Sequence, residues 1–234
     1  MPPDGTRSLS ILRSFIEGGG DVRMAVDQQG WTPLHVVCYL SAFPTAQECL
    51  DILLRKGANV SATDIRGLSP LHLAAADGRD DIAKKLLAHG ALIGLADDSG
   101  MTPLHLAAKF GHSGVVNELL DCGALLEQAS KEGKTALHHA CIGGHVSTVQ
   151  LLVGSGAKLS SKDQSGRAAL QHAQESGHDE VLGFLRRVAD RLPAGSDCLP
   201  PSQRLRRANS SGQPPSEAPP PTAVGGAGAP HRPA

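Results

Sequence analysis

The sequence predicts an all-α solenoid built from stacked helix–turn–helix units and followed by a disordered tail. Three observations lead to this fold class. A short pattern beginning T-P-L-H recurs along the chain at a nearly constant spacing. Each copy is followed by an apolar helical stripe that cannot form a core without a neighbouring copy. From residue 193 onward the composition changes to proline, serine, glycine and alanine.

The pattern occurs five times in phase. Its leucines lie at Leu34, Leu71, Leu104, Leu137 and Leu170, so the last three steps are equal and only the first is longer. A histidine follows each of the first four leucines, at His35, His72, His105 and His138, and Gln171 takes the fifth place. Because a group that recurs in every repeat is not a single active site, we interpret these histidines as parts of the scaffold. We expect each to be buried at a helix start and to hydrogen-bond backbone or hydroxyl groups nearby.

The third copy shows why these residues form two helices. Thr102 is a favourable N-cap residue, and Pro103 suits the first helical position, where no N–H is needed. In the segment 113–123, apolar residues recur at helical spacing and predict one apolar face of a second helix. These residues are Val115, Val116, Leu119 and Leu120. Gly123 follows them and can take the positive φ that ends a helix.

The full pattern is D-x-x-G-x-T-P-L-H-x-A-A-x-x-G-H followed by V-x-x-L-L-x-x-G-A, and it resembles the ankyrin repeat. The third copy matches it from Asp97 to Ala124, and the resemblance covers about residues 8 to 192. It implies two helices per repeat, joined to the next repeat by a short, outward, β-hairpin-like connection and stacked into a curved solenoid. It also implies a module that binds proteins through the hairpin tips and the exposed side of each first helix.

The spacing divides the chain into seven segments. These are an N-terminal partial repeat (1–26), repeats 1 to 4 (27–63, 64–96, 97–129 and 130–162), repeat 5 (163–192) and the tail (193–234). Repeat 5 lacks the threonine, proline and histidine of the pattern and is more polar, so we expect it to be the C-terminal cap.

Other parts of the chain also depart from the pattern. Repeat 1 has four additional residues within 38–50, which form either a tolerated loop insertion, the favoured interpretation, or a recognition loop with Phe43 and Pro44 at its tip. Residues 12–22 resemble the second helix and exit of a further repeat whose first helix is missing. Repeat 4 carries Ser130 where the pattern has aspartate, and it also lacks the proline.

The tail should be disordered because it cannot form a packed core. Ten of the sixteen prolines lie within residues 193–234. The basic cluster at 204–207 is followed by serines, and we favour a solvated linker over a kinase site there.

Composition argues against several classes of function. The net charge is −1 and aromatic residues make up 3% of the chain, so we expect no direct binding to nucleic acid. The number of cysteines is odd, at five, and no CxxC spacing occurs, which disfavours disulfides and zinc and favours a reducing compartment. No secretory signal pattern or membrane-length apolar run is present, so we expect a cytoplasmic or nuclear protein without membrane insertion.

Catalysis is also disfavoured. The chain has no G-x-S-x-G, P-loop, H-E-x-x-H or Rossmann glycine motif, and we expect no enzyme activity, no metal and no cofactor. His138, His139 and Cys141 form a locally metal-like group. However, His138 belongs to the scaffold, and Cys141 stands where other repeats have a small alanine, so we expect it to be buried.

Candidate partner-binding residues are those that vary between repeats at the tips and inner helices. They are Trp31, Ile65, Arg66, Leu68, Asp77, Asp98, Met101, Lys109, Phe110, Lys131 and Lys134. We expect Trp31, Ile65, Leu68, Met101 and Phe110 to be open to solvent as an apolar stripe, which tends to mark an interaction site. The alternative for Trp31 is that it covers the half-built N-terminal repeat.

The expected function is that of a non-catalytic adaptor, scaffold or inhibitor, monomeric, that binds one or more partner proteins through its concave face. The resemblance leaves another function open. The chain could recruit substrates or partners to an enzyme complex such as a ubiquitin ligase, or act as a transcription-regulatory cofactor.

Overall fold

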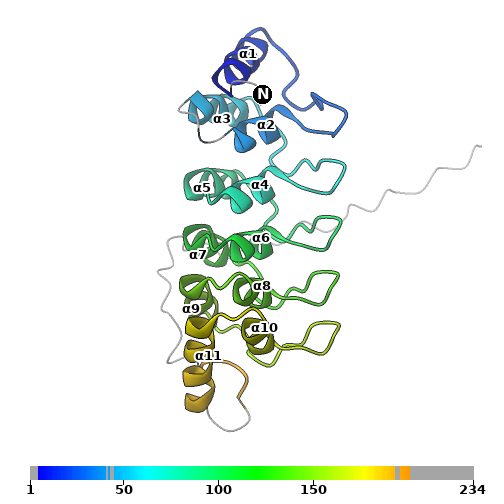
Figure 1. The fold of residues 1–234 in the computed structure, drawn as a ribbon. Helices are drawn as coiled ribbons and strands as arrows, with labels where there is room; N and C mark the ends of the chain where they lie inside the picture. The colour runs from blue at the N-terminus through cyan, green and yellow to red at the C-terminus, as the bar shows by residue number, and fades with distance from the viewer. Residues whose placement is uncertain (1–4, 41, 43–44, 193–195, 201–234) are drawn as a thin grey trace, which may run out of the picture.

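The computed structural model describes residues 5–40, 42, 45–192 and 196–200. They form one elongated stack of helix pairs, with a loop projecting to the same side from each pair (Figure 1). This confirms the expected all-α solenoid. The helices in this part of the chain are α1 (Gly5–Glu17), α2 (Pro33–Tyr39), α3 (Thr45–Arg55), α4 (Pro70–Asp77), α5 (Asp80–Ala88), α6 (Pro103–Phe110), α7 (Ser113–Asp121), α8 (Ala136–Ile142), α9 (Val146–Gly154), α10 (Ala169–Glu175) and α11 (Asp179–Arg191).

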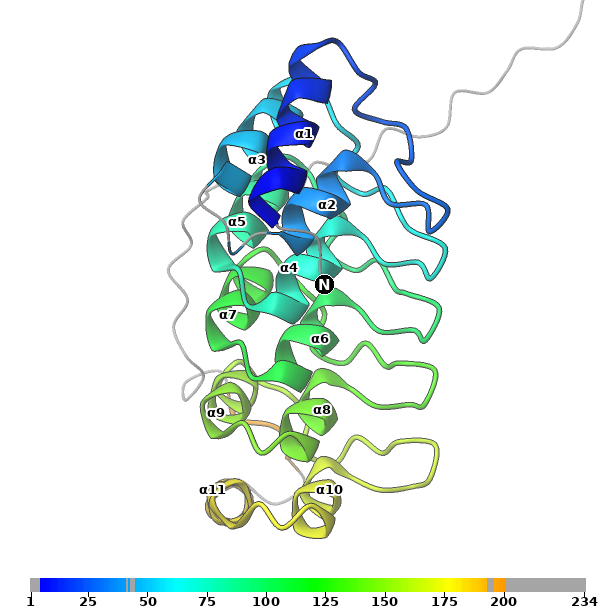
Figure 2. The ribbon, with the colours of Figure 1, turned by 45° about the horizontal axis from the view of Figure 1, so that its top comes forward.

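The helices stand in two columns (Figure 2). Helices α2, α4, α6, α8 and α10 are the first helices of the repeats, and each packs on the next. Helices α5, α7, α9 and α11 form the second column in the same way, and α1 packs against α3. We call the projecting loops fingers: residues 27–31, 64–68, 97–101, 130–134 and 163–167. The first helices lie on the finger side and so share the inner face of the stack with the fingers.

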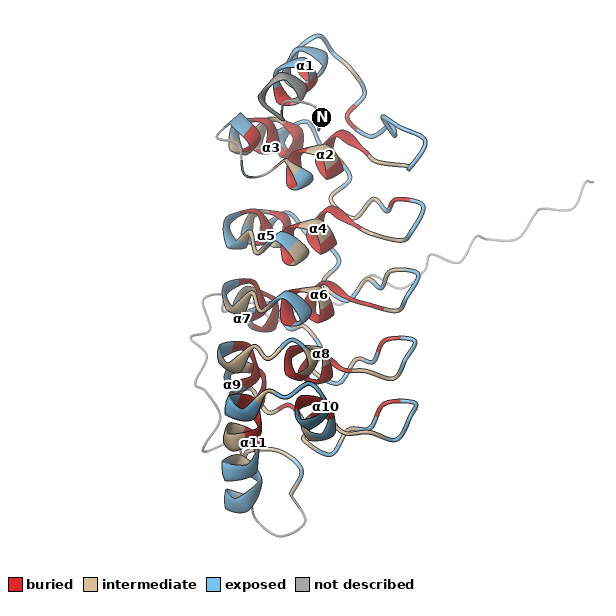
Figure 3. Cartoon of the chain, in the orientation of Figure 1, coloured by how far each residue is buried: buried red, intermediate tan, exposed pale blue. Residues whose placement is uncertain are grey.

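The core lies between the two columns and runs without interruption along the stack (Figure 3). It extends from Leu9 in α1 to Leu185 in α11. Small side chains such as Ala107 and Ala140 are fully buried in the first helices, which allows those helices to approach closely. Leu104 and Leu119 fill the space between α6 and α7. No repeat has a core of its own, so each depends on its neighbours.

The scaffold role predicted for His35, His72, His105 and His138 is confirmed. His105 is buried, and its Nδ1 accepts the N–H of Thr102 at 3.1 Å. Its Nε2 lies 3.1 Å from the carbonyl of Lys134 in the next repeat, and because a carbonyl only accepts, Nε2 carries the proton. The ring is therefore neutral, and burial lowers the pKa of His105. His35, His72 and His138 make the equivalent bonds.

A second histidine ties each of the later repeats to the one before it. His145 Nε2 lies 2.9 Å from the carbonyl of Lys109, and His112 and His178 make equivalent bonds one repeat away. The imidazole fits because Gly111 lies against it: a Cβ at Gly111 would be 2.4 Å from Nδ1 of His145. Gly111 also has a φ of +78°, which disfavours other residues.

The fingers are joined to one another by backbone bonds. In repeat 4, the N–H of Ser130 donates to the carbonyl of Lys134 at 2.9 Å and closes the finger. The N–H of Lys131 donates at 2.9 Å to the carbonyl of Ser99 in the neighbouring finger. At the base of the last finger, Lys162 and Ala168 form an isolated antiparallel β-bridge. The fingers are thus held in register although, as described, they contain no strand.

The two ends of the stack differ from the repeats. Helix α1 begins at Gly5, well before the predicted segment 12–22, and packs in the second column. At the other end, the N–H of Leu159 donates to the carbonyl of Asp197 at 2.9 Å, and Leu199 packs partly buried against the core. Residues 193–195 and 201–234 of the predicted tail, like Phe43 and Pro44 of the insertion, lie outside the described residues.

Other predicted features can be located. Cys141 is fully buried, as expected, and none of the five cysteines, which lie in the described part of the chain, forms a disulfide. Among the residues that the structure describes, no three histidine, cysteine or acidic side chains are grouped as metal ligands would be. None of the described helices combines the length and the apolar character needed to cross a bilayer.

Candidate partner-binding surface

The inner face carries three rows of equivalent positions, one residue from each repeat. The row next to the fingers is Trp31, Leu68, Met101, Lys134 and Arg167, the middle row is Val36, Leu73, Leu106, His139 and His172, and the third row is Tyr39, Ala76, Lys109, Ile142 and Glu175. The character of the rows changes along the stack. Repeats 1 and 2 are apolar at all three positions, and repeat 3 is apolar at two. Repeats 4 and 5 bring lysine, arginine, histidine and glutamate. The face is therefore divided into an apolar half and a polar half.

Most predicted residues are accessible, and one is not. Ile65 is 62% exposed and Phe110 is 48% exposed, while Trp31 and Leu68 are half-buried. The predicted polar residues Arg66, Asp77, Asp98, Lys109 and Lys131 are exposed or half-buried, and Lys134 is half-buried. The expectation that Met101 is open to solvent is wrong, because it is 8% exposed. Its backbone is held by Asp97 and His72, and its side chain forms part of a pocket wall.

Trp31 is held in place by its neighbours. Its Nε1 donates to Asp64 of repeat 2 at 3.3 Å, and its ring stacks on His35 at a centroid distance of 6.2 Å. Tyr39 meets the indole edge-on at 5.3 Å and is itself 65% exposed. The sequence analysis did not identify Tyr39, although this residue occupies in repeat 1 the position that Lys109 occupies in repeat 3. The pair forms an aromatic end to the apolar half of the inner face.

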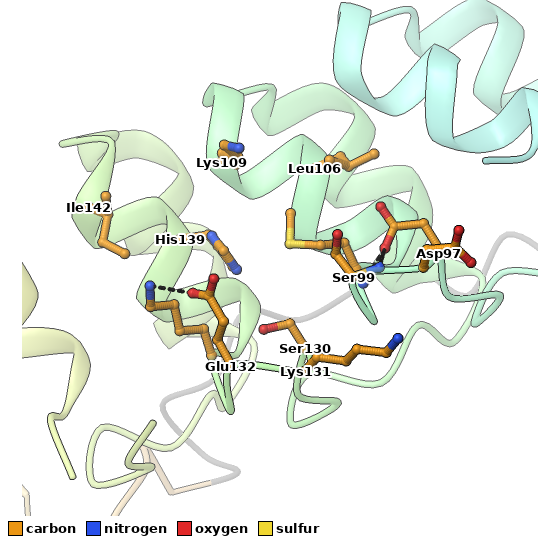
Figure 4. A pocket seen from close by; sticks show the side chains of 12 residues that line it. Asp97, Ser99, Leu106, Lys109, Ser130, Lys131, Glu132, His139 and Ile142 are labelled. Atoms are coloured by element: carbon orange, nitrogen blue, oxygen red, sulfur yellow. Dashed lines mark hydrogen bonds and ion pairs between the residues drawn. The ribbon is translucent and has the colours of Figure 1, made fainter. Parts of the chain in front are cut away.

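A pocket of about 610 Å³ opens between repeats 3 and 4 (Figure 4). It is lined by Asp97, Asp98, Ser99, Met101, Leu106, Lys109, Ser130, Lys131, Glu132, Lys134, His139 and Ile142. It brings together five of the predicted residues: Asp98, Met101, Lys109, Lys131 and Lys134. The other six (Trp31, Ile65, Arg66, Leu68, Asp77 and Phe110) lie outside this lining. The pocket is at the junction of the apolar and polar halves.

Two polar atoms in the pocket lining have no hydrogen-bond partner within the part of the chain that the structure describes: Oγ of Ser130 and Nε2 of His139. Both atoms are shielded from solvent, and the whole Ser130 residue is only 8% exposed. Burial, followed by the nearby His105, Lys134 and Lys109, lowers the pKa of His139 to about 3, so the ring is neutral at about pH 7. Sequence reasoning assigned no binding role to either residue. The available signal was that each differs from its equivalents, Asp97 and Leu106, in repeat 3.

The charges around the pocket are partly used within the protein. Lys134 pairs with Glu132 at 2.6 Å, and the carboxylate of Asp97 accepts backbone N–H groups of its own finger. Lys109 lies 5.6 Å from the centre of the Phe110 ring. Lys131 is exposed at the tip of its finger. The rim therefore offers two ammonium groups, those of Lys109 and Lys131, for which the described part of the chain gives no carboxylate partner.

The comparisons with known proteins agree with this architecture. A family model for ankyrin repeats in three copies matches residues 40–130 and 122–190, which together exceed half of the chain. Ankyrin repeat domain-containing protein 53 is 37% identical over 73 residues in both Mus musculus and Homo sapiens. The human 2-5A-dependent ribonuclease is 31% identical over 70 residues. Each match covers 30% of this chain, and they cover 14%, 13% and 9% of the respective relatives.

Proposed function

Because the chain belongs to the ankyrin-repeat family, we propose that it is a non-catalytic protein-interaction module that holds a segment of a partner protein along its inner face. Ankyrin repeats imply a protein–protein interaction module. The proposal rests on the observation that two groups of residues have different roles. The ring nitrogens of the recurring histidines bond the start of their own helix or the backbone of a neighbouring repeat. The residues that vary between repeats instead line an open pocket and the face around it.

The divided inner face defines the kind of segment it would hold. Tyr39, Ile65 and Phe110 offer exposed apolar surface, and large exposed side chains of this kind are typical anchors in interfaces. Lys109 and Lys131 then offer positive charge, which favours encounter with an acidic partner. We therefore propose a partner segment with apolar residues toward repeats 1 to 3 and acidic residues toward repeat 4.

The hydrogen bonds of the recurring histidines also support a non-catalytic role. Since His35, His72, His105 and His138 hold their protons in bonds to backbone carbonyls, they are not placed to act as acids or bases. The ribonuclease match concerns 70 residues of that protein and brings no activity to this chain. We further propose that the protein is monomeric, does not bind nucleic acid directly and acts in the cytoplasm or nucleus, where cysteines stay reduced.

The proposal can be tested by affinity capture from the source cell followed by mass spectrometry, with the full chain as bait. The test variant replaces Tyr39, Ile65 and Phe110 with alanine; all three are exposed, so the fold should persist. The matched control replaces Ile11, Leu92 and Leu125, which are exposed apolar residues outside the fingers and the first helices, whereas each test residue lies in a finger or a first helix. We expect the test variant to lose a partner that the control retains. Equal recovery by the two folded variants would show that the inner face is not the binding surface.

A further inference from the structure

An aspartate opens the finger in four of the five repeats, at Asp27, Asp64, Asp97 and Asp163. Its carboxylate has a local task. In repeat 3, Oδ1 of Asp97 accepts the N–H of Ser99 and the N–H of Met101, both at 2.8 Å. The other three aspartates bond the corresponding N–H groups of their own fingers. Each of these fingers is thus closed around its own carboxylate.

Repeat 5 shows a further use of this carboxylate. Oδ2 of Asp163 lies 2.8 Å from Nε2 of His172, and both residues are buried. Burial alone would raise the pKa of Asp163, but the bonds from Ser165, Arg167 and His172 outweigh it and lower that pKa. A carboxylate at this place is therefore a stable anion bound by a hydroxyl, two backbone N–H groups and an imidazole.

Repeat 4 has the same arrangement without the carboxylate. Ser130 and Asp163 occupy equivalent positions of repeats 4 and 5, and so do His139 and His172. The finger backbone closes as in repeat 5, with the N–H of Ser130 bonded to the carbonyl of Lys134 at 2.9 Å. However, among the described residues Oγ of Ser130 and Nε2 of His139 find no hydrogen-bond partner. The N–H groups of Glu132 and Lys134, which correspond to those capped by Asp163, find no acceptor within the described part of the chain.

The residues with these unpartnered groups belong to the lining of the pocket. Ser130, Glu132 and His139 lie around the same hollow, with the hydroxyl of Ser130 directed toward it (Figure 4). With the ring proton of His139 on Nε2, a carboxylate is the group that fits, because it only accepts hydrogen bonds and would leave no donor of its own unsatisfied. The lysines on the rim, Lys109 and Lys131, also favour an anion over a cation.

We propose that this pocket receives one aspartate or glutamate side chain of the partner, whose carboxylate takes the place of the one that repeat 4 lacks. The inference rests on the proposed function, since it names the chemistry that the inner face would recognise. It makes Ser130 and His139 specificity-determining residues. The partner's carboxylate would accept from the Ser130 hydroxyl and from Nε2–H of His139.

The test uses acetate as a carboxylate probe and the ring nitrogens of His139 as the reporter, followed by nuclear magnetic resonance on the ¹⁵N-labelled full chain. Acetate should move the His139 signals saturably, and acetamide at the same ionic strength should not. The variant Ser130→Asp supplies the carboxylate internally. It should reproduce the acetate-bound His139 spectrum without acetate, raise the pKa of His139 and weaken acetate binding at least about tenfold. The control Ala129→Asp adds the same charge at an exposed neighbouring position outside the pocket lining and should bind acetate as the wild type does.

The outcomes separate this inference from the proposed function. If acetate leaves His139 unchanged, or moves it equally in wild type and in Ser130→Asp, the carboxylate site is wrong. A bound water that merely fills the space would give this result. If Ser130→Asp captures the cellular partner as well as wild type while the Tyr39/Ile65/Phe110 variant does not, the inner face binds but the carboxylate site fails. Loss of the partner in Ser130→Asp, but not in Ala129→Asp, supports the inference.

Discussion

Replacing His105 by alanine tests how the repeats are held together. The ring of His105 accepts the N–H of Thr102 at 3.1 Å and lies 2.8 Å from its hydroxyl. It also donates to the carbonyl of Lys134 at 3.1 Å, which belongs to the next repeat. The alanine variant removes all of these bonds at a site that is almost fully buried. It also leaves the buried N–H of Thr102 without its acceptor, whereas the carbonyl of Lys134 keeps its bond from the N–H of Ser130.

The size of the effect follows from these bonds. A buried donor or acceptor left without a partner costs about 1–3 kcal/mol, and this cost, together with the lost bond to Lys134 and the lost ring packing, gives about 2–5 kcal/mol. The chain itself provides a milder comparison. In repeat 5, Oε1 of Gln171 accepts the N–H of Ala168 at 2.8 Å. His105→Gln should therefore keep the bond to Thr102, lose only the bond to Lys134, and cost about 1–2 kcal/mol.

Urea denaturation of the two variants, followed by far-ultraviolet circular dichroism, gives the free energies of unfolding. We expect wild type to be more stable than His105→Gln, and His105→Gln to be more stable than His105→Ala. If both variants unfold within about 0.5 kcal/mol of wild type, the histidines do not hold the repeats together. If the two variants lose equal amounts, the bond to the helix start and the bond to the next repeat do not contribute separately.

Three further predictions concern stability. Burial lowers the pKa of His105 and of its equivalents below the ordinary value of 6.5, and it also lowers the pKa of His139. The unfolded chain therefore binds more protons than the folded chain, and the unfolding free energy should fall as the pH drops through 6.5. His139→Leu should reduce that fall in acid titrations monitored by circular dichroism. Gly111→Ala should lower the melting temperature more than Gly90→Ala, because both glycines have positive φ but only a Cβ at Gly111 meets an imidazole, at 2.4 Å; equal losses would contradict this. Leu104→Ala should lower the unfolding free energy by about 2–5 kcal/mol in urea, and a loss below about 1 kcal/mol would contradict the burial of this leucine.

Much of the fold follows from short-range patterns, and this explains why the sequence predicts it well. The threonine, proline and histidine at residues 102–105 each have a local task at a helix start, and the structure confirms those tasks. The constant spacing of the later copies then places equivalent groups on top of one another. The start of α1 at Gly5 could not be found in this way, because no copy of the repeat pattern precedes it.

The candidate site was less predictable, because accessibility depends on neighbours rather than on the position in the repeat. Met101 and Leu68 are equivalent by sequence, yet Met101 is buried and Leu68 is half-buried. The sequence shows that Ser130 departs from the pattern. It does not show which hydrogen-bond donors would surround an aspartate carboxylate at that position. Those donors come from the finger and from His139, which are brought together only in the folded repeat.

The contrast between repeats 4 and 5 indicates that repeat 4 is less stable than it could be. Asp163 and His172 satisfy each other, whereas Ser130 and His139 leave two buried polar atoms unpaired, each at a cost of about 1–3 kcal/mol. The backbone does not require this loss, because both fingers close with the same 2.9 Å bond. The unpaired atoms lie in the pocket at the junction of the apolar and polar halves. A partner carboxylate that pairs with them would recover that free energy on binding, so Ser130→Asp should raise stability while lowering partner affinity. A purely structural serine would leave partner affinity unchanged.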